Sequence, residues 1–133
     1  MKPRFLSLDA VLEIHNQQIA LYGGLDGVRD PGALESAVGT PQATFGGQYL
    51  HEPILAMAAA YLFHIAMNHP FLDGNKRAGA NAAVTFLYVN DWSLDMDVPG
   101  FIDLVMAVAS GTMGKAELVK VFEAQSRADG AIG

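Results

Sequence analysis

The strongest constraint on the fold is a pair of apolar segments joined by a short polar run. The first apolar segment covers residues 54–67, and the second covers residues 78–89. Between them, residues 69–77 read HPFLDGNKR. Polar groups placed between two buried segments must be hydrogen-bonded, face water or bind a ligand. The pattern therefore predicts two central helices, with a functional loop and helix start at residues 69–77.

The second half of this run has the chemistry of a phosphate site. Pro70 and Gly74 interrupt the helical pattern and shape a loop. Asn75, Lys76 and Arg77 then fall on the first turn of the following helix, where free backbone N–H groups and the helix dipole favour an anion. An arginine can also hold two phosphate oxygens at once. We therefore expect this turn to bind phosphate.

Two further residues of the run suggest catalysis. Asp73 supplies a carboxylate suited to Mg²⁺, which proteins usually hold with one or two carboxylates and substrate phosphates. Histidine side chains in general have a pKa of about 6.5, so a histidine at position 69 can act as a base near neutral pH. Taken singly, each of these residues also has a structural interpretation, as a helix cap or a solvated charge. Together they predict transfer of a phosphate-containing group from a nucleotide to a hydroxyl.

The run resembles the signature of the Fic/Doc family, H-x-F-x-[D/E/N]-x-N-[G/K]-R, and agrees with it at every constrained position. It is similar to the Doc (death-on-curing) toxin branch, because Lys76 stands where AMP-transferring Fic enzymes usually have glycine. Ala80 also occupies the place of a second arginine found in many Fic enzymes. Residues 22–32 resemble the N-terminal part of Doc-like proteins, so the similarity covers nearly the whole chain.

The resemblance implies an all-α fold: a single compact domain of about six helices over residues 1–133, with the motif in a central helix–loop–helix. It implies a possible flap at residues 42–51, which would align a target segment near the active site by strand addition. The alternative for that segment is a plain connector. The implied site has His69 as the catalytic base and Asp73 as the Mg²⁺ ligand. The residues expected to contact ATP are Gly74, Asn75, Lys76, Arg77 and Asn81.

The resemblance leaves two reactions open. Doc phosphorylates a threonine of elongation factor Tu with the γ-phosphate of ATP and so blocks translation, whereas Fic enzymes transfer AMP. Lys76 favours the Doc reaction, because its side chain fills space that AMP-transferring enzymes leave to the nucleotide. Pro70, Leu72 and Gly74 are more Fic-like and keep AMP transfer as the alternative. No Ser or Thr begins the inhibitory pattern [S/T]-x-x-x-E-[G/N], so we expect a separate Phd-like antitoxin to restrain the protein.

The amino-acid composition excludes several other classes of protein function. The net charge of −6 argues against direct nucleic-acid binding, which needs a basic face, and so against a helix-turn-helix protein. The chain has no cysteine, in keeping with a cytoplasmic protein. We expect neither a signal peptide nor a membrane span. A helical binding module that only keeps the motif as a scaffold is the other non-enzyme alternative.

Local signals place the remaining helices. Ser7 or Asp9 caps a first helix that runs to about Tyr22, with His15 on its inner face as a buried structural residue. His64 is interpreted as structural too. Asp30 and Asp97 are predicted to cap the helices that follow them. The other predicted segments are a short helix at 31–38, a flexible loop at 46–49, a helix start at 51–53, an extended connector at 92–96, helices at 99–109 and 115–126, and a frayed tail at 128–133.

Overall fold

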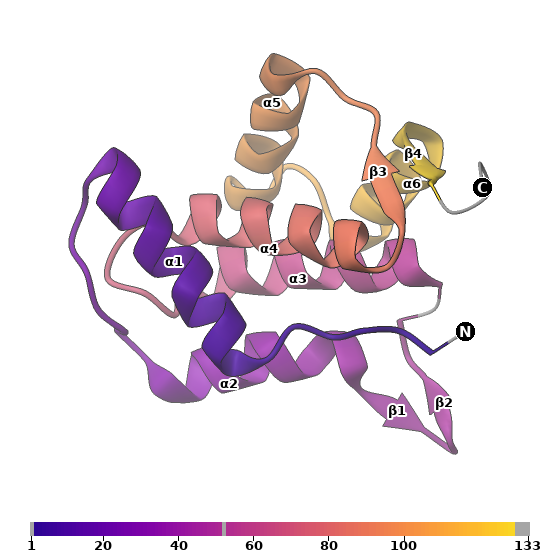
Figure 1. Ribbon diagram of the computed structural model, residues 1–133, viewed down its shortest axis with the longest axis horizontal. Coiled ribbons are helices and arrows are strands. Elements are labelled where there is room, and N and C mark those ends of the chain that lie inside the picture. The colour runs from indigo at the N-terminus through magenta and orange to yellow at the C-terminus, as the bar shows by residue number, and fades with distance from the viewer. Residues whose placement is uncertain (1, 52, 130–133) are drawn as a thin grey trace.

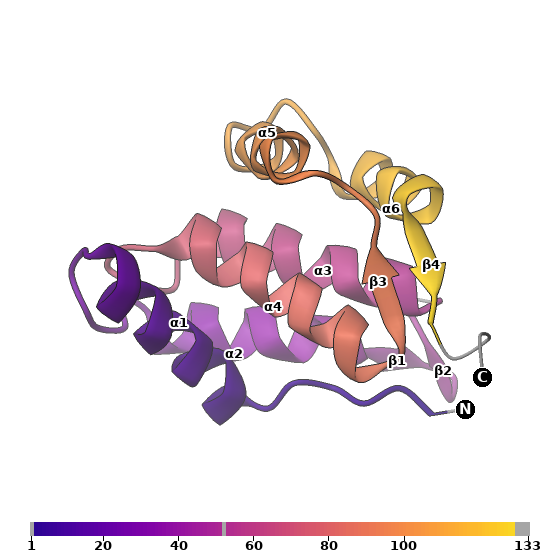
Figure 2. The same cartoon turned by 45° about the horizontal axis from the view of Figure 1, so that its top comes forward.

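Two antiparallel helices form the centre of the molecule, and the motif joins them. The computed structural model describes residues 2–51 and 53–129. Helices α3 (Ile54–Asn68) and α4 (Asn75–Val89) make up the middle layer, with α1 (Leu8–Tyr22) and α2 (Pro31–Gly39) on one side (Figure 1). Helices α5 (Val98–Ala109) and α6 (Lys115–Gln125) cover the other side (Figure 2). The expected all-α domain of six helices is confirmed for the described residues.

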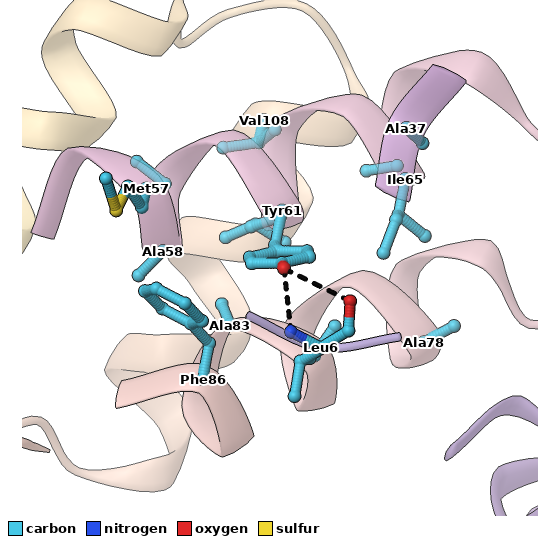
Figure 3. Packing of buried hydrophobic residues seen from close by; sticks show 14 of the residues in the cluster. Leu6, Ala37, Met57, Ala58, Tyr61, Ile65, Ala78, Ala83, Phe86 and Val108 are labelled. Atoms are coloured by element: carbon cyan, nitrogen blue, oxygen red, sulfur yellow. Dashed lines mark hydrogen bonds between the residues drawn. The ribbon is translucent and has the colours of Figure 1, made fainter. Parts of the chain in front are cut away.

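The middle layer is held by close packing of small and aromatic side chains. Almost every residue of α3 from Leu55 to Ala66 is buried, as expected for a helix that is apolar all round. On α4, a Cβ atom placed at Gly79 would lie 3.1 Å from the Leu62 carbonyl oxygen, so the two backbones approach closely there. Figure 3 shows Tyr61 packed against Phe86, with its hydroxyl accepting a hydrogen bond of 2.9 Å from the Leu6 N–H. This packing fixes the two helix ends that carry the motif.

Three helices begin at the caps that the sequence predicts. The side chains of Ser7, Asp30 and Asp97 each accept a hydrogen bond from the backbone three residues later, which satisfies a free N–H group of the first turn. The predicted start of the helix that follows α2 is at residues 51–53 and includes residue 52, which lies outside the described residues. Helix α3 itself begins at Ile54. No helix in the described part of the chain is long and apolar enough to cross a membrane.

The segment expected to be a flexible loop at 46–49 belongs to a β-hairpin instead. After the short 3-10 helix Thr40–Gln42, strand β1 (Thr44–Phe45) pairs with β2 (Gln48–Tyr49). Two glycines with positive φ, Gly46 and Gly47, make the turn. The hairpin lies at the opposite end of α3 from the motif in both ribbon views (Figures 1 and 2). In this structure the possible flap at 42–51 therefore does not border the motif.

The frayed tail expected at residues 128–133 is contradicted at residues 128 and 129. Strand β4 (Ser126–Ala128) pairs with β3 (Trp92–Leu94), which lies within the segment 92–96 that was expected to be an extended connector. The Asp129 N–H also donates to the Asp91 carbonyl at 2.8 Å. Residues 130–133 lie outside the described residues. The sequence around Ser126 has little strand propensity, so the pairing partner decides its conformation.

Candidate functional site

The backbone at His69 is held in an unusual conformation at the end of α3. His69 is the C-cap of that helix and adopts the left-handed region, with φ 47° and ψ 54°. The Arg29 Nε–H donates to the His69 carbonyl oxygen at 2.6 Å, and its Nη2 donates to the Asn68 carbonyl at 3.0 Å. The imidazole itself is exposed and forms no hydrogen bond among the described residues. The side chain is therefore free to meet a substrate, while its backbone is fixed.

A cleft of about 420 Å³ opens beside this histidine. Its volume falls within the usual range for small-molecule sites. One residue of its lining, Ala109, comes from the end of α5; the others all belong to the motif, namely His69, Leu72, Asp73, Gly74, Asn75, Lys76 and Arg77. Of the predicted site residues, Asn81 alone does not line the cleft; its Nδ2 donates to the Arg77 carbonyl oxygen at 2.8 Å.

The Asp73 carboxylate faces the segment after α1. Its Oδ1 accepts from the Gly74 N–H at 2.9 Å, and its Oδ2 accepts from the Leu25 N–H at 3.3 Å. Each oxygen keeps a further lone pair. No group of three or more His, Cys, Asp or Glu side chains that could hold a metal occurs in the described parts of the chain. A single carboxylate fits Mg²⁺ that is completed by nucleotide phosphates and water, and does not fit a site built from protein ligands alone.

Two residues predicted to bind phosphate also hold the site together. The Asn75 side chain accepts from the Phe71 N–H at 2.9 Å and donates to the Phe71 carbonyl at 3.1 Å, which closes the loop. Arg77 donates from Nη1 to the Gln18 carbonyl at 3.1 Å and from Nη2 to the Gly23 carbonyl at 3.0 Å, both at the end of α1. Arg77 has N–H donors to spare, so its phosphate role stays a prediction.

Lys76 differs from its neighbour Arg77 in being exposed. It takes part in neither of the salt bridges found among the described residues. It lies on the first turn of α4, whose N-cap Gly74 has a positive φ of 76° that favours glycine. Lys76 is therefore the exposed cation of the cleft lining, at the position where the sequence predicts phosphate.

His15 was expected to be a buried structural residue, and its burial is confirmed, with 1% of its surface exposed. The sequence did not reveal what it touches. Its ring stacks on Phe71 with 3.7 Å between centroids, and its Nε2 lies 2.8 Å from the Asp73 carbonyl oxygen. Arg29 was missed as well. The signal for Arg29 was the resemblance of residues 22–32 to Doc-like proteins, and the signal for His15 was its place on the inner face of the first helix. Neither signal gave a contact partner.

The substitution His15→Phe tests whether this contact stabilises the loop. Phenylalanine keeps the stacking on Phe71 but removes the N–H donor to the Asp73 carbonyl. We expect the free energy of unfolding to fall by about 1–3 kcal/mol, the usual effect of leaving a polar group without its partner. Chemical denaturation measures it. The exposed neighbour Asn16→Ala should change the free energy of unfolding by less than about 0.5 kcal/mol. Equal stabilities for both variants would show that the His15 contact contributes nothing.

Comparison with known proteins identifies a family and two relatives. Residues 5–87 match the Fic/DOC family. The chain is 34% identical over 108 residues to "Protein kinase doc" of Escherichia phage P1, covering 81% of this chain and 84% of that protein. It is 44% identical over 91 residues to "Toxin Doc" of Mycolicibacterium smegmatis (strain ATCC 700084 / mc(2)155), covering 67% of this chain and 70% of that protein.

Proposed function

Because the chain belongs to the Fic/DOC family, we propose that it is a toxin that transfers the γ-phosphate of ATP to a hydroxyl of a protein target. The names of the two relatives, a protein kinase and a toxin, support this activity. The observation that carries the choice of γ-phosphate is Lys76, an exposed cation beside the same cleft as His69 and Asp73. A cation there favours a triphosphate placed along the first turn of α4.

The reaction assigns one role to each group. His69 takes the proton of the target hydroxyl as its oxygen bonds to the γ-phosphorus. The bond from that phosphorus to the β-phosphate oxygen breaks, and ADP leaves. Lys76 and the N–H groups at the start of α4 stabilise the phosphate oxygens. Asp73 would hold Mg²⁺ together with the nucleotide, and the ion, when bound, neutralises phosphate charge.

The proposal includes two partners, an antitoxin and a translation factor. A threonine of elongation factor Tu is the proposed acceptor, and a small Phd-like antitoxin is the proposed inhibitor, both because of the family resemblance. One feature of the protein surface supports the proposal of an antitoxin partner. An apolar hollow of about 310 Å³ lies where α4, β3 and α5 meet, and its lining includes Tyr88, Trp92 and Val98. Ile102 and Met106 continue it as an exposed row on α5 toward the motif cleft. Such a surface fits the apolar face of a partner helix.

Labelled ATP distinguishes the two possible reactions. Purified protein is mixed with Mg²⁺ and purified elongation factor Tu, or with a bacterial lysate, and receives ATP labelled at either the γ- or the α-phosphate. We expect label in a protein target from γ-labelled ATP only, and its loss with His69→Ala. Label from the α-phosphate would show AMP transfer and overturn the proposal. Absence of label in both samples would favour a binding module.

A further inference from the structure

A cluster of three nitrogen-bearing side chains lies away from the motif, where α6 meets α3. Lys115 is the first residue of α6, His64 lies on α3, and His51 comes shortly before α3. Lys115 Nζ is 2.9 Å from His51 Nε2 and 3.0 Å from His64 Nε2. All three side chains are half-buried. The proposed phosphate transfer uses none of them.

The surroundings of the amine disfavour its charged form. Burial lowers the pKa of Lys115. The N-terminus of α6, with its positive end of the helix dipole, is also an unfavourable place for an ammonium group. Burial, followed by the nearby Lys115 charge, lowers the pKa of His51 and takes that of His64 to about 4. Both imidazoles are therefore neutral at pH 7 and can accept a proton.

The geometry is that of an activated nucleophile. When both imidazoles carry their proton on Nδ1, each Nε2 accepts a hydrogen bond. A neutral amine has two N–H groups and one lone pair, so bonds to His51 and His64 use both N–H groups and leave the lone pair free. A nucleophile within reach of a base is the common arrangement for group transfer to a side chain. We propose that Lys115 is a nucleophilic amine that is acylated by small acyl phosphates.

The step balances without any further reactant. The Lys115 lone pair attacks the carbonyl carbon of the acyl phosphate, and a C–N bond forms. The C–O bond to phosphate breaks, and inorganic phosphate leaves with the electron pair. One amine proton passes to His64 Nε2 and then to water.

The chain contains its own matched control. It has four lysines, at positions 2, 76, 115 and 120, and Lys120 lies on the same helix as Lys115 but is exposed. The full-length protein is incubated with acetyl phosphate at pH 7, and peptide mass spectrometry gives the initial acetylation rate at each lysine. Each pKa unit by which Lys115 lies below an exposed lysine raises its neutral fraction about tenfold. We expect Lys115 to react faster than Lys120 despite its lower exposure.

Two results would overturn the proposal. One is a rate at Lys115 equal to or below the rate at Lys120 in the unmodified sequence, a comparison that needs no variant. The other comes from His64→Gln, checked for helicity by circular dichroism. This variant should bring the Lys115 rate down toward that of Lys120, and an unchanged rate would show that the imidazole takes no proton. The ratio of rates should also shrink above pH 10, where exposed lysines become neutral.

Discussion

The substitution His69→Gly is expected to abolish phosphate transfer and at the same time make the protein more stable. His69 has a φ of 47°, and an L-residue in the left-handed region costs roughly 1–2 kcal/mol relative to glycine. Glycine also gains unfolded-state freedom, which opposes this by about 0.4–1 kcal/mol. The exposed imidazole contributes little packing. The net gain in the free energy of unfolding should be about 0.5–1 kcal/mol, while removal of a general base lowers the rate about 10²–10⁴-fold.

Asp91→Gly is the matched control for this prediction. Asp91 is the other non-glycine residue with positive φ in the described parts of the chain, at 65°, and it is exposed as well. It lies at the far end of α4, so its replacement should also stabilise the protein but leave transfer unchanged. Chemical denaturation and the γ-phosphate assay measure the two effects. If His69→Gly destabilised the protein, the histidine side chain would have a structural role that its exposure does not suggest.

The sequence predicted the part of the site that depends on residue type and local spacing. His69, Asp73 and Lys76 carry chemistry that few other residues can supply, and their separation by a few positions fixes them around one helix start. The structure brings them to one cleft. Helix caps such as Asp30 were predictable for the same reason, since a cap acts within one turn. Local chemistry therefore explains most of the fold and the composition of the motif.

Contacts between distant segments were not predictable in this way. Arg29 reaches the His69 carbonyl across 40 positions, and His15 reaches the Asp73 carbonyl across 58. Neither residue has a local pattern that names its partner. Strand β4 shows the same limit, because its pairing with β3 depends on where α6 ends rather than on its own propensity. Such residues support the motif without belonging to it.

The adjacent glycines after α1 illustrate this distinction, and they provide the second large prediction. Both have positive φ, 82° at Gly23 and 117° at Gly24, so an alanine is strained at either position. A Cβ atom at Gly23 would meet nothing within 4 Å, whereas one at Gly24 would lie 2.7 Å from Asp73 Oδ2. The sequence indicates only a helix end at both. The structure gives Gly24 a second role, which is to leave room for the Asp73 carboxylate.

Gly24→Ala should therefore damage transfer far more than Gly23→Ala. Both variants should lose about 1 kcal/mol of unfolding free energy through backbone strain. Only Gly24→Ala pushes the Asp73 carboxylate from its place, and a displacement of about 1 Å in a catalytic site can lower the rate about 100-fold. We also expect this variant to need more Mg²⁺, which initial rates of γ-phosphate transfer across a Mg²⁺ series would measure. Equal rates and equal Mg²⁺ dependence in the two variants would mean that the position of the Asp73 carboxylate does not limit the reaction, and the role of metal ligand would then have to be withdrawn from it.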